Sequence, residues 1–295
     1  LYSCSRDATV RQWNRSGGDS LRVFAGHTLA CSAVALSADE RAICSGSRDT
    51  SILLWDTETG ACKASAKVPR NLITCLMYAP AISSTISAHV VVQGGEDLRL
   101  RVWDFRESGL TPALTIEGYT YFPLSLDISH DGYHVLTSSK GFDGFGCEAK
   151  LWDIRTGALK QEYTGHTQDT TACAFLHGTA GAAGLSIGSE DLGGCESCSQ
   201  MIATASKDET IKIYDQNTGT MLVNYINPGC GGYTGLTAQQ NASGKINNGN
   251  ATVLLASTIT GGLYSLRLER PAAGVVDGPK LRLRCTGYVQ GNTIL

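Results

Sequence analysis

The segment SGSRDTSILLWD, residues 45–56, decides the fold because it carries a complete strand-turn-strand pattern. Small residues end a β-prone stretch, Asp49 follows as a turn residue, and an alternating strand closes on Trp55 and Asp56. The same order of residues occurs in SCSRDATVRQWN (3–14), QGGEDLRLRVWD (93–104), SSKGFDGFGCEAKLWD (138–153) and TASKDETIKIYD (204–215). This repetition predicts one supersecondary unit that is built several times along the chain.

The aromatic residue near the end of each segment recurs at intervals that suit one four-stranded blade per repeat. These residues are Trp13, Trp55, Trp103, Trp152 and Tyr214. The longest interval contains residues 177–200, which are rich in Gly, Ala and Ser, so we expect a flexible loop inserted within a blade. A sixth unit, residues 252–269, lacks both the Asp and the aromatic residue.

Composition narrows the functional class. The formal net charge is -3, and nucleic-acid binding relies on cations set against phosphates, so neither DNA nor RNA is an expected partner. No apolar run has the length of a transmembrane segment, and no stretch has the pattern of a signal peptide. Most of the 11 cysteines stand singly in apolar runs, which is typical of small core residues. We therefore expect a cytoplasmic protein without a cofactor.

Two Gly-His dipeptides complete a known pattern. Gly26-His27 precedes Trp55-Asp56, and Gly165-His166 precedes Tyr214-Asp215. With these dipeptides the chain resembles the WD-repeat family over nearly its whole length. The resemblance implies an all-β fold, a WD-repeat β-propeller with about six blades in residues 1–295. Because Leu1 opens directly on a strand-like pattern, we expect a single propeller domain that lacks its N-terminal part and belongs to a seven-bladed ring.

The resemblance leaves the composition of the last blade open. Propellers of this family complete that blade with a strand from the other terminus, whereas KLRLRCTGYV, residues 280–289, offers an outer strand within it. The segment GFDGFGCEAKLWDIRTG, residues 141–157, is further similar to a branch of the family that is associated with cilia. This similarity implies a setting in cilium-related trafficking or assembly.

The family resemblance also implies buried hydrogen-bonded tetrads. In each tetrad a carboxylate accepts from an imidazole, the imidazole faces a hydroxyl, and the hydroxyl meets an aromatic donor. The alternative is a catalytic triad, but that would need a free hydroxyl and oxyanion donors, so we expect no enzyme. The two predicted tetrads are His27, Ser45, Asp49 and Trp55, and His166, Thr204, Asp208 and Tyr214.

Other motifs have weaker functional interpretations. Cys195 and Cys198 form a CxxC pair that could supply half of a zinc site, but a structural site normally needs four ligands, so we expect no metal. Trp103 to Arg106 and Trp152 to Arg155 match a WDxR pattern, by which the chain resembles substrate receptors of cullin-four ubiquitin ligases. In that alternative Arg106 and Arg155 bind the ligase adaptor, and otherwise they are solvated residues that follow a strand.

The favoured interpretation is a non-enzymatic scaffold that binds other proteins through its loops. The residues immediately before the turn aspartates should point outward as a mixed-charge partner surface. In the irregular fourth repeat, two phenylalanines among glycines should join this surface, or alternatively they fold back and seal a gap in the blade. The predicted partner-binding residues on this rim are Arg6, Arg48, Glu96, Lys207, Phe142 and Phe145.

Overall fold

Strands account for all regular structure in the part of the chain that the computed structural model describes. This part comprises residues 1–80, 90–105, 112–176, 201–239, 252–269 and 281–290. The β-branched and apolar residues of the repeats form these strands, which confirms the all-β prediction. The described ranges hold no helix that could cross a membrane.

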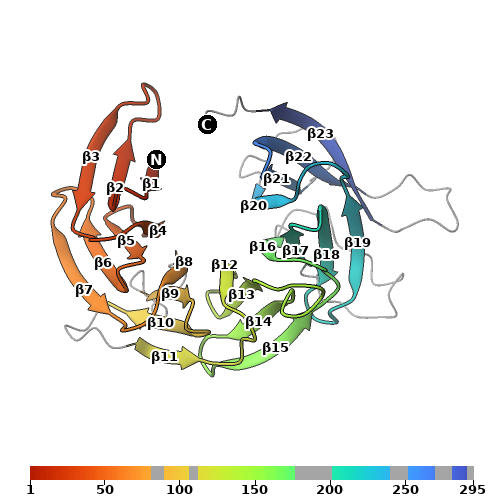
Figure 1. Ribbon diagram of the computed structural model, residues 1–295, viewed down its shortest axis with the longest axis horizontal. Helices are drawn as coiled ribbons and strands as arrows, with labels where there is room; N and C mark the ends of the chain where they lie inside the picture. Colours follow the sequence, from red (N-terminus) through yellow and green to blue (C-terminus); the bar gives the residue numbers. More distant parts are fainter. Residues whose placement is uncertain (81–89, 106–111, 177–200, 240–251, 270–280, 291–295) are drawn as a thin grey trace, which may run out of the picture. The chain divides into compact units, whose positions relative to one another are not determined.

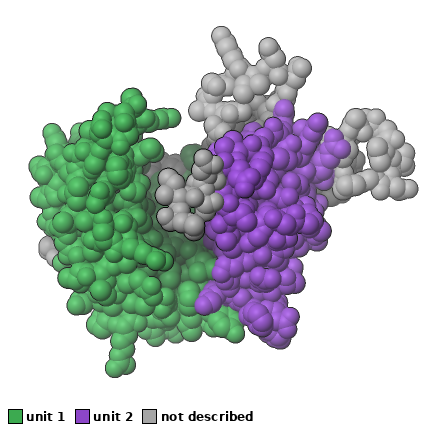
Figure 2. Space-filling view, turned by 45° about the horizontal axis from the view of Figure 1, so that its top comes forward, with its two compact units in different colours: residues 1–139, 151–160 green, residues 140–150, 161–295 purple. Residues whose placement is uncertain are grey.

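The first three sheets belong to one compact unit, residues 1–139 and 151–160, coloured green in Figure 2. Each sheet is antiparallel, and its strands neighbour one another in chain order. The first contains β1 (Tyr2–Cys4), β2 (Thr9–Trp13) and β3 (Ser20–Ala25). The second contains β4 (Cys31–Leu36), β5 (Ala42–Ser47), β6 (Ser51–Asp56) and β7 (Cys62–Lys67). The third contains β8 (Ile73–Tyr78), β9 (Val90–Gly95), β10 (Leu100–Asp104) and β11 (Pro112–Ile116).

The second compact unit comprises residues 140–150 and 161–295, and residues of both units contribute to the fourth sheet. The fourth sheet contains β12 (Pro123–Ile128), β13 (His134–Ser139), β14 (Ala149–Asp153) and β15 (Ala158–Tyr163). The fifth contains β16 (Thr170–Leu176), β17 (Met201–Ser206), β18 (Thr210–Asp215) and β19 (Met221–Ile226). The sixth contains β20 (Tyr233–Gln239), β21 (Val253–Thr258), β22 (Gly262–Glu269) and β23 (Arg282–Gln290). Figure 1 shows the strands of each sheet in chain order.

The sequence left open whether residues 280–289 form the outer strand of the last repeat, and strand β23 lies there. It pairs with β22 from Gly262↔Gln290 to Glu269↔Arg282 and is therefore the outer strand of the sixth sheet. The degenerate unit at residues 252–269 forms β21 and β22, as its strand-like pattern predicts. The predicted inserted loop, residues 177–200, lies outside the described residues.

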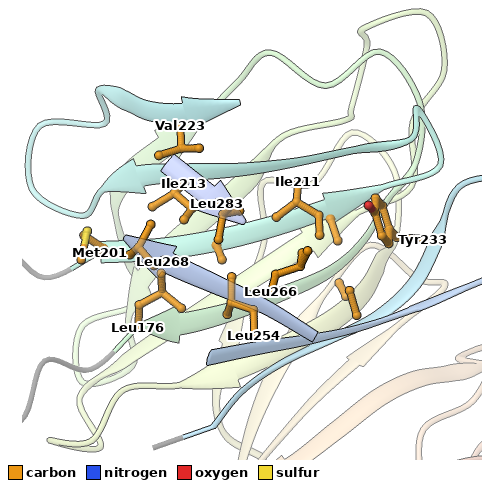
Figure 3. Packing of buried hydrophobic residues seen from close by; sticks show 14 of the residues in the cluster. Leu176, Met201, Ile211, Ile213, Val223, Tyr233, Leu254, Leu266, Leu268 and Leu283 are labelled. Carbon is orange, nitrogen blue, oxygen red and sulfur yellow. The ribbon is translucent and has the colours of Figure 1, made fainter. Parts of the chain in front are cut away.

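Burial follows the position of a strand within its sheet. The inner strand β17 is buried along its whole length, whereas the outer strand β15 is exposed at most of its positions. Such inner strands are covered on both faces, so their sequences need not alternate. In the second unit, Ile211 and Ile213 pack with Leu254, Leu266 and Leu268 of the next sheet, as Figure 3 shows. Sheet-to-sheet packing therefore supplies the core, while the turns between strands stay available for other roles.

Candidate functional site

The structure brings His27, Ser45, Asp49 and Trp55 together in the second sheet. The imidazole Nδ1 lies 3.0 Å from Asp49 Oδ2, and its Nε2 lies 2.8 Å from Ser45 Oγ. The indole Nε1 of Trp55 donates to the same Ser45 Oγ at 2.8 Å. The residue before the histidine must be small, because a Cβ on Gly26 would meet Trp55 Cη2 at 2.8 Å. The Gly-His dipeptide and the tryptophan are thus parts of one packed unit.

Asp49 is the anchor of this tetrad. Its carboxylate also accepts from the backbone N of Thr28 at 2.9 Å and from the backbone N of Ser51 at 2.9 Å. Burial alone would raise the pKa of Asp49, but hydrogen bonds from Ser51, Thr28 and His27 outweigh it and lower the pKa to about 2. The ionised carboxylate therefore fixes the turn and the imidazole at the same time.

The arrangement does not suit catalysis, although the order of groups is that of a triad. Ser45 is 0% exposed, and its oxygen is shared between the His27 ring and the Trp55 indole. A substrate carbonyl would have to reach this oxygen, and a nucleophile needs such access. The tetrad is therefore best interpreted as structural.

The second predicted tetrad forms with one difference. His166 Nδ1 lies 3.0 Å from Asp208 Oδ2, and His166 Nε2 lies 2.8 Å from Thr204 Oγ1. Tyr214, however, donates its hydroxyl to the backbone oxygen of Thr164 at 2.8 Å, so it does not simply replace the indole donor. A phenol carries its donor at the far end of the ring, beyond the place of an indole nitrogen. Burial raises the pKa of Tyr214, which keeps this hydroxyl protonated.

The remaining sheets keep only parts of this network. In the first sheet Trp13 Nε1 donates to Ser3 Oγ at 2.8 Å. In the third, Trp103 Nε1 lies 3.3 Å from Gln93 Oε1, while Asp97 binds Arg101. The third repeat is therefore bonded differently from the two complete tetrads.

In the fourth sheet a tyrosine replaces the histidine of the tetrad, and sequence reasoning missed it. Tyr119 occupies the place of the histidine, and its hydroxyl lies 2.8 Å from Thr137 Oγ1. Trp152 Nε1 donates to the same Thr137 oxygen at 3.2 Å. The available signal was the dipeptide Gly118-Tyr119, because Gly118 lies beside the Trp152 ring as Gly26 lies beside Trp55.

We predict that Asp49→Ala destabilises the protein by about 1–3 kcal/mol at neutral pH, because it leaves two backbone N-H groups without their acceptor and leaves the buried imidazole Nδ1 with Ser51 Oγ alone. Urea unfolding measures this loss. The low pKa of Asp49 adds a pH signature, since a lowered pKa contributes stability above the unfolded value that disappears as pH falls through the folded one. The difference between wild type and variant should therefore shrink between about pH 4 and pH 2. An Asp49→Ala variant that unfolds like wild type at pH 7 would contradict the role of the tetrad.

The residues before the turn aspartates occupy equivalent positions in successive sheets. The backbone N of Arg48 donates to Ala30 O at 3.0 Å, and that of Glu96 donates to Leu72 O at 2.9 Å. The backbone N of Lys207 donates to Asp169 O at 3.0 Å in the same way. Arg6, Arg48, Glu96 and Lys207 are all exposed. Lys207 also forms an ion pair with Asp169 at 2.6 Å, so its ammonium is less free than the sequence suggested.

Sequence reasoning missed the residue of this series that lies in the sixth sheet. Ile259, whose backbone N donates to Gly232 O at 3.0 Å, takes the equivalent position in the sixth sheet and is exposed. The degenerate sixth repeat lacks the turn aspartate that located the others.

Phe142 and Phe145 lie on a two-residue β-hairpin, which we call the Phe hairpin (residues 140–147). The two phenylalanines pair with each other, with N···O distances of 2.9 and 3.0 Å. Between them Asp143 and Gly144 have φ values of 51° and 81°, as a type I′ turn requires. The rings are 77% and 73% exposed, so the alternative in which they seal the blade does not hold.

The second unit holds the Phe hairpin in place. The backbone N of Gly144 donates to Thr167 O at 3.1 Å, and that of Gly141 donates to Asp169 Oδ1 at 3.0 Å. Thr170 Oγ1 donates to the backbone oxygen of Cys147. Asp169 was not predicted from the sequence, because it lies on the connection that follows Gly165-His166 and meets the hairpin only in three dimensions.

The structure says less about the residues of the WDxR and CxxC motifs. Arg155 is 55% exposed in its side chain, donates to both carboxylate oxygens of Asp153, and lies 4.4 Å from the centre of the Tyr133 ring. Arg106, Cys195 and Cys198 lie outside the described residues. Within the residues that are described, no group of three His, Cys, Asp or Glu side chains gathers as for a metal ion.

Comparison with known proteins agrees with this geometry. The family model described as "WD domain, G-beta repeat" matches residues 18–56, which contain the first tetrad. The fold is that of a WD-repeat β-propeller.

Several curated relatives match between about half and three quarters of the chain at low identity. Nuclear distribution protein PAC1 of Arthroderma otae is 27% identical over 77% of this chain and 49% of its own length. Nuclear distribution protein nudF of Emericella nidulans is 26% identical over 59% of this chain and 41% of its own length. The ribosome biogenesis protein WDR12 homolog of Oryza sativa subsp. japonica is 33% identical over 53% of this chain and 34% of its own length. The chain spans about half the length of the first of these relatives and less of the other two. None of the three names indicates a catalytic family.

Proposed function

We propose that this WD-repeat protein is a non-enzymatic scaffold that binds protein partners through the turns carrying Arg6, Arg48 and Glu96. The observation that supports this proposal is that all three side chains precede a turn aspartate and are exposed, and that the backbone N of Arg48 and of Glu96 is fixed by a hydrogen bond. Within the described residues none of the three has an ion pair in the structure. A charged side chain that its own fold leaves unpaired is available for a partner, where charge complementarity sets specificity and association rate.

The cellular setting of the scaffold is a narrower part of the proposal. The similarity of residues 141–157 to WD repeat-containing protein 31 supports cilium-related trafficking or assembly, in a cytoplasmic protein. The names of the relatives support nuclear distribution or ribosome biogenesis instead. The ligase-receptor alternative stays a second proposal, since Arg155 is bound to Asp153 and Arg106, in the better-matching WDxR motif, lies outside the described residues.

A pair of charge reversals tests the proposed surface. We predict that Arg6→Glu with Arg48→Glu lowers recovery of bound proteins by affinity purification at least about tenfold, since each interfacial like-charge contact costs several kcal/mol. The matched control is Arg15→Glu with Arg41→Glu, which makes the same charge change at exposed turns of the same two sheets, at the other ends of their strands. Equal recovery by the two variants would refute the assignment of this surface.

A further inference from the structure

The Phe hairpin has the features of an interface anchor rather than of a core element. Phe142 and Phe145 are about three-quarters exposed, so burial of their rings adds little to the stability of the fold. The backbone of the hairpin is nevertheless fixed by hydrogen bonds. Aromatic side chains on a fixed backbone lose little entropy on binding, and such residues dominate interface energetics. The described part of the chain gives no reason for this combination of exposed rings and a fixed backbone.

The glycines of the hairpin show that its conformation is specified by the sequence. A Cβ on Gly141 would meet the backbone N of Cys147 and the backbone O of Phe145 at 2.5 Å each, so only glycine closes the base of the hairpin. Gly144 has a φ of 81° with open space around it, so its role is conformational. Phe142 and Phe145 are directly opposite each other, which places both rings on one face of the hairpin.

The charge at the turn adds a second requirement. Asp143 lies between the two phenylalanines, is exposed, and has no hydrogen bond or ion pair within the described chain. It contributes one negative charge beside two apolar rings. A complementary surface must therefore remove two rings from water and offer a positive or donor group to this carboxylate.

We propose that the Phe hairpin is a preorganised knob that enters an apolar pocket of a folded partner protein, with Asp143 paired to a basic side chain at the edge of that pocket. The inference rests on the proposed scaffold function and names the partner chemistry for a second surface of it. A convex, rigid element needs a concave partner, which favours a folded protein over an extended peptide. A membrane surface fits less well, because the unpaired carboxylate would face anionic headgroups.

Site-specific crosslinking tests where the hairpin docks. The probe is p-benzoylphenylalanine introduced at Phe145 in the full chain, followed by illumination in cell extract and mass spectrometry of the crosslinked peptide. We expect a dominant protein adduct whose acceptor residue lines an apolar pocket edged by Lys or Arg. The same probe at Ile226, which is exposed on the outer strand β19, should not give this adduct. An adduct with lipid, an adduct in an unstructured segment, or no adduct would overturn the proposal.

The partner domain that the crosslink identifies can be purified, and its affinity for variants of this chain tests the contributions of the rings, the turn and the charge separately. Phe142→Ala with Phe145→Ala should weaken binding at least about 30-fold without a change in melting temperature. Gly144→Ala leaves both rings in place but strains the turn, so it should weaken binding as well. Asp143→Asn retains a turn sequence that favours type I′, so it should keep the hairpin, weaken binding several-fold and remove its salt dependence.

The outcomes separate this proposal from the scaffold function itself. If wild type recovers partners that depend on Arg6 and Arg48 while the Phe145 probe forms no adduct, the knob is refuted and the scaffold stands. If Gly144→Ala binds as tightly as wild type, preorganisation is refuted. A double phenylalanine variant that melts earlier but binds normally would show that the rings serve the fold, contrary to the proposal.

Discussion

Trp55→Ala is expected to lower the free energy of unfolding by about 3–5 kcal/mol, the range for removing a large buried aromatic side chain. Trp55 is 2% exposed, its ring meets Phe24 edge-on at a centroid distance of 5.8 Å, and its indole donates to Ser45. The substitution removes both interactions and leaves a cavity between the first two sheets. Denaturant unfolding followed by circular dichroism measures the loss.

Trp13→Ala is the matched control for this experiment. Trp13 makes the same bond, from Nε1 to Ser3 Oγ at 2.8 Å, but its side chain is only half-buried. Because less apolar surface returns to water, the loss should be clearly smaller than for Trp55. Equal losses would mean that the hydrogen bond, and not the packing between sheets, determines the contribution of the repeated tryptophan.

Gly95→Ala is the second substitution with a large expected effect, about 1–3 kcal/mol of destabilisation from overpacking. A Cβ at this position would lie 1.7 Å from Asn71 Oδ1 and 2.6 Å from Asn71 Cγ. Asn71 is fully buried, so its amide has little freedom to move aside. Thermal or denaturant unfolding should therefore show a clear loss for the addition of one methyl group.

A second variant identifies the cause of that loss. Asn71→Ala removes the obstructing amide, and neither Nδ2 nor Oδ1 of Asn71 has a hydrogen-bond partner, so little is sacrificed with it. The double variant Asn71→Ala with Gly95→Ala should recover much of the stability lost by Gly95→Ala alone. If the double variant is as unstable as Gly95→Ala alone, the destabilisation comes from the β9 backbone and not from the steric overlap with Asn71.

The repeated segments contain most of what determines the fold. Asp49 and Trp55 were sufficient to predict a turn followed by a strand, because local turn chemistry and alternation act over a few residues. Tyr119 was missed because the search was for Gly-His, and the dipeptide Gly118-Tyr119 gains its meaning once the tyrosine hydroxyl is seen beside Thr137. Asp169 was missed for a related reason, since it meets Gly141 across 28 residues of sequence. The exposure of Phe142 and Phe145 depends on a type I′ turn, with positive φ at Asp143 and Gly144, which the sequence reasoning did not predict.

The repeated aromatic position gives the two compact units different optical properties. All four tryptophans of the chain, at residues 13, 55, 103 and 152, belong to the first unit, whereas the second carries Tyr214 at the equivalent place. Intrinsic tryptophan emission therefore arises from residues of the first unit, and Trp13 is the most solvent-accessible emitter. Far-ultraviolet dichroism reports on the strands of both units. The native sequence thus contains an internal pair of signals that reveals whether the two units lose their structure in one step, without any added label.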